Sequence, residues 1–132
     1  MEWAIGQSMW KGDVDTLQKA IIHQLEEDKA DEIAIIDLEG KTSFADRMII
    51  ADGRSVRHVS SVADSLVKEL KELGLDYISL EGTETCDWVL IDAGDIVVHL
   101  FRPGVREIYN LEKMWAIAPR DTQISDGQLL DA

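Results

Sequence analysis

The stretch from Trp88 to Trp115, WVLIDAGDIVVHLFRPGVREIYNLEKMW, carries most of the information about how this chain folds. It contains two apolar runs, Trp88 to Asp92 and Ile96 to Phe101, which are separated by a short segment around Gly94. Two such runs joined by a turn predict a β-hairpin. The stretch has a tryptophan at each end and no plausible catalytic nucleophile. It therefore indicates a docking surface rather than an active site.

A short helix is expected after the Pro-Gly pair that ends the hairpin. Ile108, Leu111 and Trp115 recur at helical spacing and are expected to form its buried stripe. Tyr109 and Glu112 lie three positions apart, so they share a different side of the helix and are poor candidates for the core. These two side chains are therefore expected at the surface.

The residues before the hairpin show helix and strand patterns. Apolar residues recur at helical spacing from about Asp15, where Asp15 and Gln18 have the form of a capping box. The expected elements are a helix to about Asp28, strands at Ile33–Asp37, Arg47–Ala51 and Tyr77–Leu80, and a helix that Ser55 begins and Gly74 ends. The complete order α-β-β-α-β-β-β-α predicts a single-domain α/β sandwich with a mixed five-stranded sheet flanked by helices.

The length of the chain fits one domain. Its 132 residues, 45% of them hydrophobic, fall within the roughly 100 to 200 residues of a typical single domain. We place that domain at residues 13–118. Residues 1–12 show no clear periodicity and are expected to form a flexible arm. Residues 119–132 are polar and unpatterned and are expected to form a disordered acidic tail.

Charge and cysteine content restrict the partners and the compartment. The chain has 13 Lys and Arg against 26 Asp and Glu, a net charge of -13, which opposes binding to nucleic acid and favours a basic protein surface. The single Cys86 cannot form an internal disulfide, so a reducing, cytoplasmic location is expected. No run of about 18 apolar residues predicts a membrane span, and the first residues do not resemble a secretory signal.

Trp88 begins the first strand of the hairpin and shares one face of that strand with Leu90 and Asp92. If Val89 and Ile91 point to the core, the face that carries Trp88 is partly exposed beside an acidic residue. Exposed aromatic side chains among charges are typical anchors of protein interfaces. The alternative, a tryptophan buried in the core, is left open by the pattern alone.

Acidic residues and histidines raise the question of a metal site. Asp92 and Asp95 flank the hairpin turn, and their spacing is compatible with a metal. A hairpin turn favours Asp for its own local hydrogen bonding, and we prefer that interpretation. His23, His58 and His99 form no metal-ligand spacing, and His99 is expected to be a structural residue beside the tryptophan across the hairpin. We therefore expect neither a metal nor a cofactor.

The start of the second expected helix concentrates positive charge. Arg54, Ser55, Arg57 and His58 lie there, where the helix dipole favours an anion. A phosphate or carboxylate ligand is one interpretation of this segment. A solvated turn with Ser55 as the N-cap is the simpler one, and we prefer it.

Many short matches in one order make the chain resemble the ribosomal silencing factor family, also called Iojap-like proteins. The residues that match the pattern of the family are Trp88, Asp92, Gly94, Asp95, His99, Arg106, Tyr109, Leu111, Glu112 and Trp115. The resemblance extends from about Thr16 to Trp115 and is specific, because so many matches co-occur. It implies a small α/β domain with a nucleotidyltransferase-like topology.

The resemblance also implies a function and a site. Members of the family bind the large ribosomal subunit through its fourteenth protein and keep the small subunit from joining, which represses translation when nutrients are scarce. Carried over to this chain, the docking face consists of Trp88, Leu90, Asp92, Asp95, Tyr109 and Glu112. Enzymatic activity is not expected, because the chain lacks the paired metal-binding aspartates that nucleotidyltransferases carry on a strand after a glycine-serine turn.

Two other interpretations stay open. One is a nucleotidyltransferase-like enzyme or nucleotide-binding protein that uses Arg54, Ser55, Asp92 and Asp95. The other is a homodimer of the free protein through a sheet edge, which does not exclude binding to the ribosome.

Overall fold

The computed structural model describes residues 12–43 and 45–111. Its elements are α1 (Val14–Glu27), β1 (Asp31–Asp37), β2 (Arg47–Asp52), α2 (Val56–Glu72), β3 (Ser79–Glu81), β4 (Trp88–Asp92), β5 (Ile96–Phe101) and α3 (Val105–Tyr109). The predicted order of helices and strands is therefore confirmed. The predicted arm, except for Gly12, and the predicted tail lie outside the described residues, as do Glu112 and Trp115.

The strands form one sheet in the order β1-β2-β5-β4-β3. β2 and β5 run parallel, and the other neighbouring pairs are antiparallel. This arrangement confirms the mixed five-stranded sheet of an α/β fold. Parallel neighbours need a long crossover, and here α2, β3 and β4 lie between β2 and β5 in the chain.

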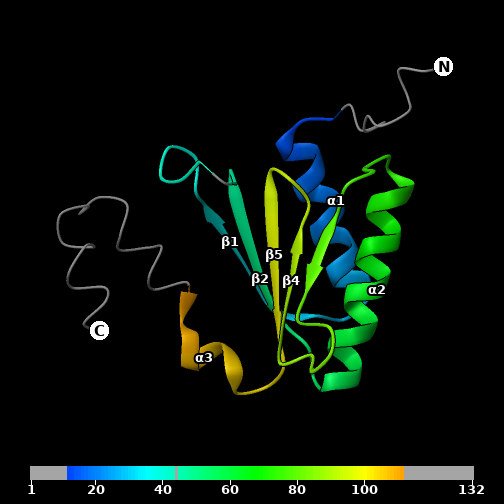
Figure 1. The fold of residues 1–132 in the computed structure, drawn as a ribbon, viewed down its shortest axis with the longest axis vertical. Helices are drawn as coiled ribbons and strands as arrows, with labels where there is room; N and C mark the ends of the chain where they lie inside the picture. Colours follow the sequence, from blue (N-terminus) through cyan, green and yellow to red (C-terminus); the bar gives the residue numbers. More distant parts are fainter. Residues whose placement is uncertain (1–11, 44, 112–132) are drawn as a thin grey trace.

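The two long helices cover one face of the sheet, and α3 lies on the other side (Figure 1). Apolar residues at helical spacing on α1 and α2 meet the side chains of the strands that point the same way. The buried residues of this core include Leu17, Ile21, Leu25, Val59, Leu66, Leu70, Ile49, Val89, Ile91 and Val98. None of the helices in the described part of the chain has the length and apolar character needed to cross a bilayer.

The two ends of α2 follow the predicted sequence signals. The hydroxyl of Ser55 accepts a hydrogen bond from the amide of His58 at 3.1 Å, as an N-cap does. Gly74 has a φ of 110°, a left-handed conformation that few other residues adopt without strain. Both predicted boundaries of this helix are confirmed.

The predicted capping box of α1 is wrong. The N-cap is Asp13, whose carboxylate accepts a hydrogen bond from the amide of Thr16 at 2.9 Å. Asp15 and Gln18 instead bind the guanidinium of Arg47 on β2, at 2.7 and 2.9 Å. A tertiary contact thus uses the two side chains that local spacing assigned to the helix end.

The third strand is shorter than predicted. It covers Ser79–Glu81, and Tyr77, which was expected inside it, is 76% exposed. β3 pairs only with β4, and Ser79 already lies opposite Asp92, the last residue of that strand. The ladder has no partner for earlier residues, so the strand cannot extend back to Tyr77.

Candidate partner-binding face

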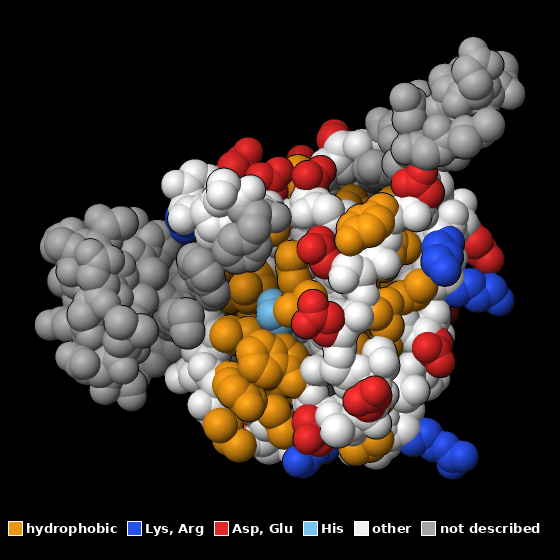
Figure 2. Space-filling model, in the orientation of Figure 1, with side chains coloured by type: hydrophobic (Ala, Val, Ile, Leu, Met, Phe, Trp, Pro, Cys, Tyr) orange, Lys and Arg blue, Asp and Glu red, His pale blue; other side chains and the backbone are white. Residues whose placement is uncertain are grey.

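The sheet face opposite α1 and α2 carries the predicted docking residues of β4. The alternation along β4 buries Val89 and Ile91 against the helices and leaves Trp88, Leu90 and Asp92 half-buried on the opposite side. We call this side the open face; its strand residues are Met48, Ile50, Trp88, Leu90, Val97, His99 and Phe101. Figure 2 shows hydrophobic side chains gathered where α3 meets the sheet, with acidic side chains beside them.

Trp88 is the centre of an aromatic cluster on the open face. The centroid of its ring system lies 4.4 Å from that of Tyr109 and 5.3 Å from that of Phe101. Its indole Nε1 donates a hydrogen bond to Nδ1 of His99, with 2.8 Å between the nitrogens. Because Trp88 packs in this cluster and is only half-buried, it combines the two alternatives that the sequence left open.

His99 is a buried neighbour of Trp88, as the hairpin pattern predicted. Its side chain is 5% exposed, and this burial lowers its pKa from 6.5 to about 4. Since Nδ1 accepts the indole hydrogen bond, the imidazole is neutral and carries its proton on Nε2.

No group of three or more His, Cys, Asp or Glu within the described residues is arranged to hold a metal ion.

The hairpin turn accounts for the position of its two aspartates. The carboxylate of Asp92 accepts a hydrogen bond from the amide of Gly94 at 2.9 Å, and Gly94 has a φ of 90°. The carbonyl of Asp95 accepts hydrogen bonds from the amides of Asp46 and Arg47 at 2.8 and 3.1 Å. The side chain of Asp92 thus serves the turn and also borders the open face, while Asp95 is exposed at the tip.

The last helix differs from its prediction. α3 ends at Tyr109, because Asn110 adopts a left-handed conformation with a φ of 49°. Its buried residues are Val105 and Arg106, whereas Ile108, predicted to be core, is 74% exposed. The prediction is therefore wrong for Ile108, whereas Leu111, predicted for the same stripe, packs against the buried residues of the open face.

Three residues connect α3 to the open face and its edge: Val105, Arg106 and Tyr109. Tyr109 is 48% exposed, and its ring packs against that of Trp88, so two predicted docking residues lie side by side. Arg106 belongs to the matched family pattern, but no structural role was predicted for it, since a charged residue is expected at the surface. The signal was its spacing: Arg106 and Tyr109 lie three apart and share one side of α3.

The basic turn before α2 is engaged in local bonds. The backbone amide of Arg54 donates to Nδ1 of His58 at 2.9 Å, and Nε2 of the same ring donates to the carbonyl of Asp28 at 2.7 Å. The guanidinium of Arg54 pairs with Asp31 at 3.2 Å. These contacts favour the solvated turn over an anion site.

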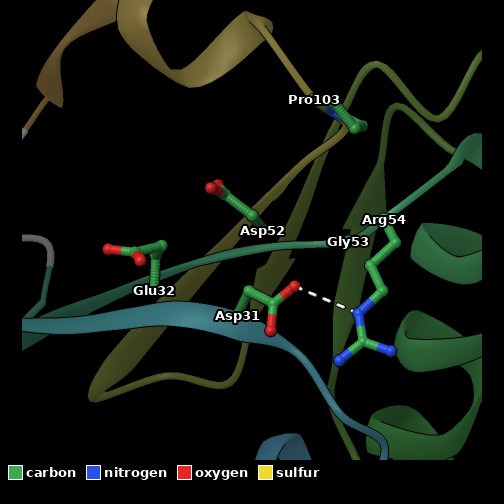
Figure 3. Close-up of a pocket in the computed structure, with 6 residues that line it drawn as sticks. All are labelled: Asp31, Glu32, Asp52, Gly53, Arg54 and Pro103. Carbon is green, nitrogen blue, oxygen red and sulfur yellow. Dashed lines mark hydrogen bonds and ion pairs between the residues drawn. The ribbon is translucent and has the colours of Figure 1, made fainter.

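Three carboxylates surround the open hollow next to this turn, which measures about 460 Å³. Its lining residues are Asp31, Glu32, Asp52, Gly53, Arg54 and Pro103 (Figure 3). Burial raises the pKa of Asp52, partly offset by the nearby Arg106. An anionic ligand would meet the negative charges of this lining.

The residues of the nucleotidyltransferase alternative are not brought together. Ser55 follows the carboxyl end of β2, whereas Asp92 and Asp95 lie at the turn before β5. β2 and β5 are parallel and in register from Arg47 opposite Ile96 to Asp52 opposite Phe101. The turn aspartates therefore sit at one end of the sheet and the basic turn at the other, about 20 Å apart by the rise of a six-residue strand.

Fold and face together define a small α/β domain with an aromatic, acid-bordered surface on the sheet side opposite its long helices. A family model described as "Ribosomal silencing factor during starvation" matches residues 12–131. The chain belongs to this family of ribosomal silencing factors, as its sequence pattern indicated.

Individual relatives agree with this assignment. Ribosomal silencing factor RsfS of Zymomonas mobilis is 48% identical over 112 residues, which cover 84% of this chain and 84% of that protein. A crystal structure of a Chromobacterium violaceum protein is 41% identical, has a TM-score of 0.77, and covers 80% of this chain and 88% of that one. A mouse relative named "Mitochondrial assembly of ribosomal large subunit protein 1" is 33% identical over 87% of this chain and 50% of its own length.

Proposed function

We propose that this protein binds the large ribosomal subunit through the fourteenth protein of that subunit, and that it does so with the open face. The observation that carries the proposal is the pair of the half-buried Trp88 and the exposed Tyr109, with rings 4.4 Å apart, in a chain that belongs to the silencing factor family. Tryptophan and tyrosine offer a large contact area and have few rotamers to fix on binding. The predicted contact residues are Trp88, Leu90, Asp92, Asp95, Tyr109 and Glu112.

The charge of the protein supports a basic protein partner. The net charge is -13, and Asp92 and Asp95 lie at the hairpin turn, at the end of the open face away from Trp88. Acidic residues at the margin of an apolar patch attract a basic surface and speed encounter, and they disfavour direct contact with RNA phosphates. The name of the mouse relative, which refers to the large ribosomal subunit, points to the same partner class.

Bound to the large subunit, the protein occupies the surface that the small subunit needs for joining. It therefore acts by steric exclusion, needs no chemical step, and represses translation in the cytoplasm when nutrients are limited. A homodimer of the free protein, formed through the edge strand β1 or β3, stays a prediction.

Sedimentation with purified ribosomal subunits tests this proposal. We expect the protein to pellet with large subunits but not with small subunits, and to reduce the fraction of joined ribosomes when it is bound to large subunits before small subunits are added. Failure to pellet with large subunits would contradict the proposal. Pelleting without any reduction in joined ribosomes would contradict the steric mechanism.

A further inference from the structure

α3 is not stable by itself. It has five residues, and an isolated helix of fewer than about 12 residues is marginal in water. Gly104, at its N-cap, makes no side-chain capping bond, and Asn110, at its C-cap, has a left-handed backbone. Contacts with the rest of the domain must therefore hold α3 in place, and its buried residues are Val105 and Arg106.

Arg106 connects α3 to two strands of the sheet. Its Nη1 donates to the carbonyl oxygen of Glu32 at 2.6 Å and to the carboxylate of Asp52 at 3.2 Å. Both side chains of the ion pair are sheltered, with 10% of Arg106 and 22% of Asp52 exposed. Hydrogen bonds between charged groups at such sheltered positions are stronger than those at the surface.

The anchor points of Arg106 belong to a distorted part of the sheet edge. The pairing of β1 with β2 shifts register between Asp31 and Ala34, and Glu32, within the shift, has a φ of 52°. This left-handed conformation is unusual for a residue other than glycine. Figure 3 shows Glu32 and Asp52 on the neighbouring strands β1 and β2, with carboxylates that point away from Arg54. The carbonyl oxygen that accepts from Arg106 thus belongs to the irregular part of β1.

The same anchor fixes which side of α3 faces the aromatic cluster. Tyr109 lies three residues after Arg106 and therefore on the same side of the helix, with its ring against Trp88. Ile108, between them, points to solvent and is 74% exposed. A rotation of α3 that released Arg106 would also move Tyr109 away from Trp88.

We propose that Arg106 is a positioning residue of the partner-binding face, which acts through its bonds to Glu32 and Asp52 and holds Tyr109 against Trp88 before the large subunit binds. Preorganisation of this kind reduces the loss of conformational entropy on binding and so raises affinity without a direct contact. The inference rests on the proposed function of the open face.

A double-mutant cycle separates positioning from a general structural role. We expect Arg106→Gln to weaken binding to large subunits by about tenfold in the parent chain, and by less than about twofold in a Tyr109→Ala background. Equal losses in both backgrounds would overturn the inference. Arg54→Gln is the matched control, because Arg54 lines the hollow beside Glu32 and Asp52 and pairs with Asp31 of β1 at 3.2 Å.

A measurement on the free protein tests the positioning role of Arg106 without the ribosome. Nuclear Overhauser contacts between the rings of Tyr109 and Trp88 should weaken in Arg106→Gln and persist in Arg54→Gln. Unchanged contacts in Arg106→Gln would overturn the inference, whereas a Tyr109→Ala variant that binds large subunits normally would instead overturn the proposed face. If Arg106→Gln does not fold, Asp52→Ala removes one acceptor of the Arg106 guanidinium, and the same loss of ring contacts is expected.

Discussion

The indole Nε1 of Trp88 donates a hydrogen bond to Nδ1 of His99 across the β4–β5 hairpin, with 2.8 Å between the two nitrogens. The two residues are diagonal neighbours, since Trp88 lies opposite Phe101 and His99 opposite Leu90. The bond needs an unprotonated Nδ1, so it ties the orientation of the central tryptophan to the neutral state of a buried histidine.

The first prediction is a loss of stability in mild acid that depends on His99. Burial lowers the pKa of His99 to about 4, against 6.5 in the unfolded chain, so the unfolded state binds more protons between these values. The part of the unfolding free energy that depends on a neutral His99 is fully present above pH 6.5. It is lost as the pH falls towards 4, by about 3 kcal/mol in total. Urea denaturation across this range measures the loss.

Carboxylates also titrate in the lower part of this range, so variants are needed to isolate His99. His99→Gln should show a smaller loss of unfolding free energy between pH 6.5 and 4 than the parent chain. His23→Gln, which changes an exposed histidine on α1, should match the parent. Parallel curves for His99→Gln and the parent would contradict the prediction.

The second prediction compares two glycines that share a left-handed backbone. A Cβ at Gly82, where φ is 86°, would lie 2.1 Å from the carbonyl oxygen of Trp88. A Cβ at Gly94, where φ is 90°, would have no atom within 4 Å. We expect Gly94→Ala to destabilise the domain by about 1 kcal/mol, from backbone strain alone, and Gly82→Ala by about 3 kcal/mol or more. Urea denaturation of both variants checks this, and similar values would show that the close approach to Trp88 is unimportant.

The third prediction concerns the acidic margin of the open face. Asp92→Asn keeps an oxygen that can accept from the amide of Gly94 but removes the charge, and Asp95→Lys reverses the charge of an exposed residue. Together they should slow association with large subunits and reduce its dependence on salt, because opposite charges steer the encounter. Asp64→Asn with Glu72→Lys on α2 changes the net charge by the same three units on the side of the sheet that the helices cover, and should have a smaller effect. Stopped-flow association rates at low and high salt test this, and equal effects would mean that only total charge matters.

The fourth prediction is that nucleoside triphosphates with magnesium do not bind. Nucleotidyl transfer needs carboxylates that converge on magnesium beside a phosphate-binding turn. In this fold Asp92 and Asp95 lie at the opposite end of the parallel β2–β5 pair from Ser55. Millimolar triphosphate with magnesium should therefore leave the melting temperature unchanged. A thermal shift that Asp92→Asn abolishes would favour the enzyme interpretation.

Apolar runs bounded by turn residues and the capping residues at helix ends made most of the fold predictable. β4 and β5 have the predicted bounds, because their apolar runs are interrupted only by a turn that needs Asp and Gly. Ser55 and Gly74 mark the ends of α2 through bonds and backbone angles that are local in sequence. Predictions of this kind succeed where neighbours in the chain decide the structure.

α3 shows where such reasoning stops. Its five residues are too few for helical periodicity to identify a buried side, and Ile108 was assigned to the core in error. The side that faces the sheet is set by the bonds of Arg106 to Glu32 and Asp52, which lie 74 and 54 positions away in the chain. The partial burial of Trp88 depends on Tyr109 in the same way, so the alternation along β4 alone could not decide it.

The affinity for large ribosomal subunits of Tyr109→Ala, compared with Tyr77→Ala, tests the central claim most directly. Each variant removes one exposed tyrosine: Tyr109 is 48% exposed on the aromatic cluster, and Tyr77 is 76% exposed before β3, outside the open face. We predict that Tyr109→Ala weakens binding by at least about tenfold and that Tyr77→Ala leaves it within about twofold of the parent chain. Equal affinities for the two variants would contradict the assignment of the open face as the ribosome-binding surface.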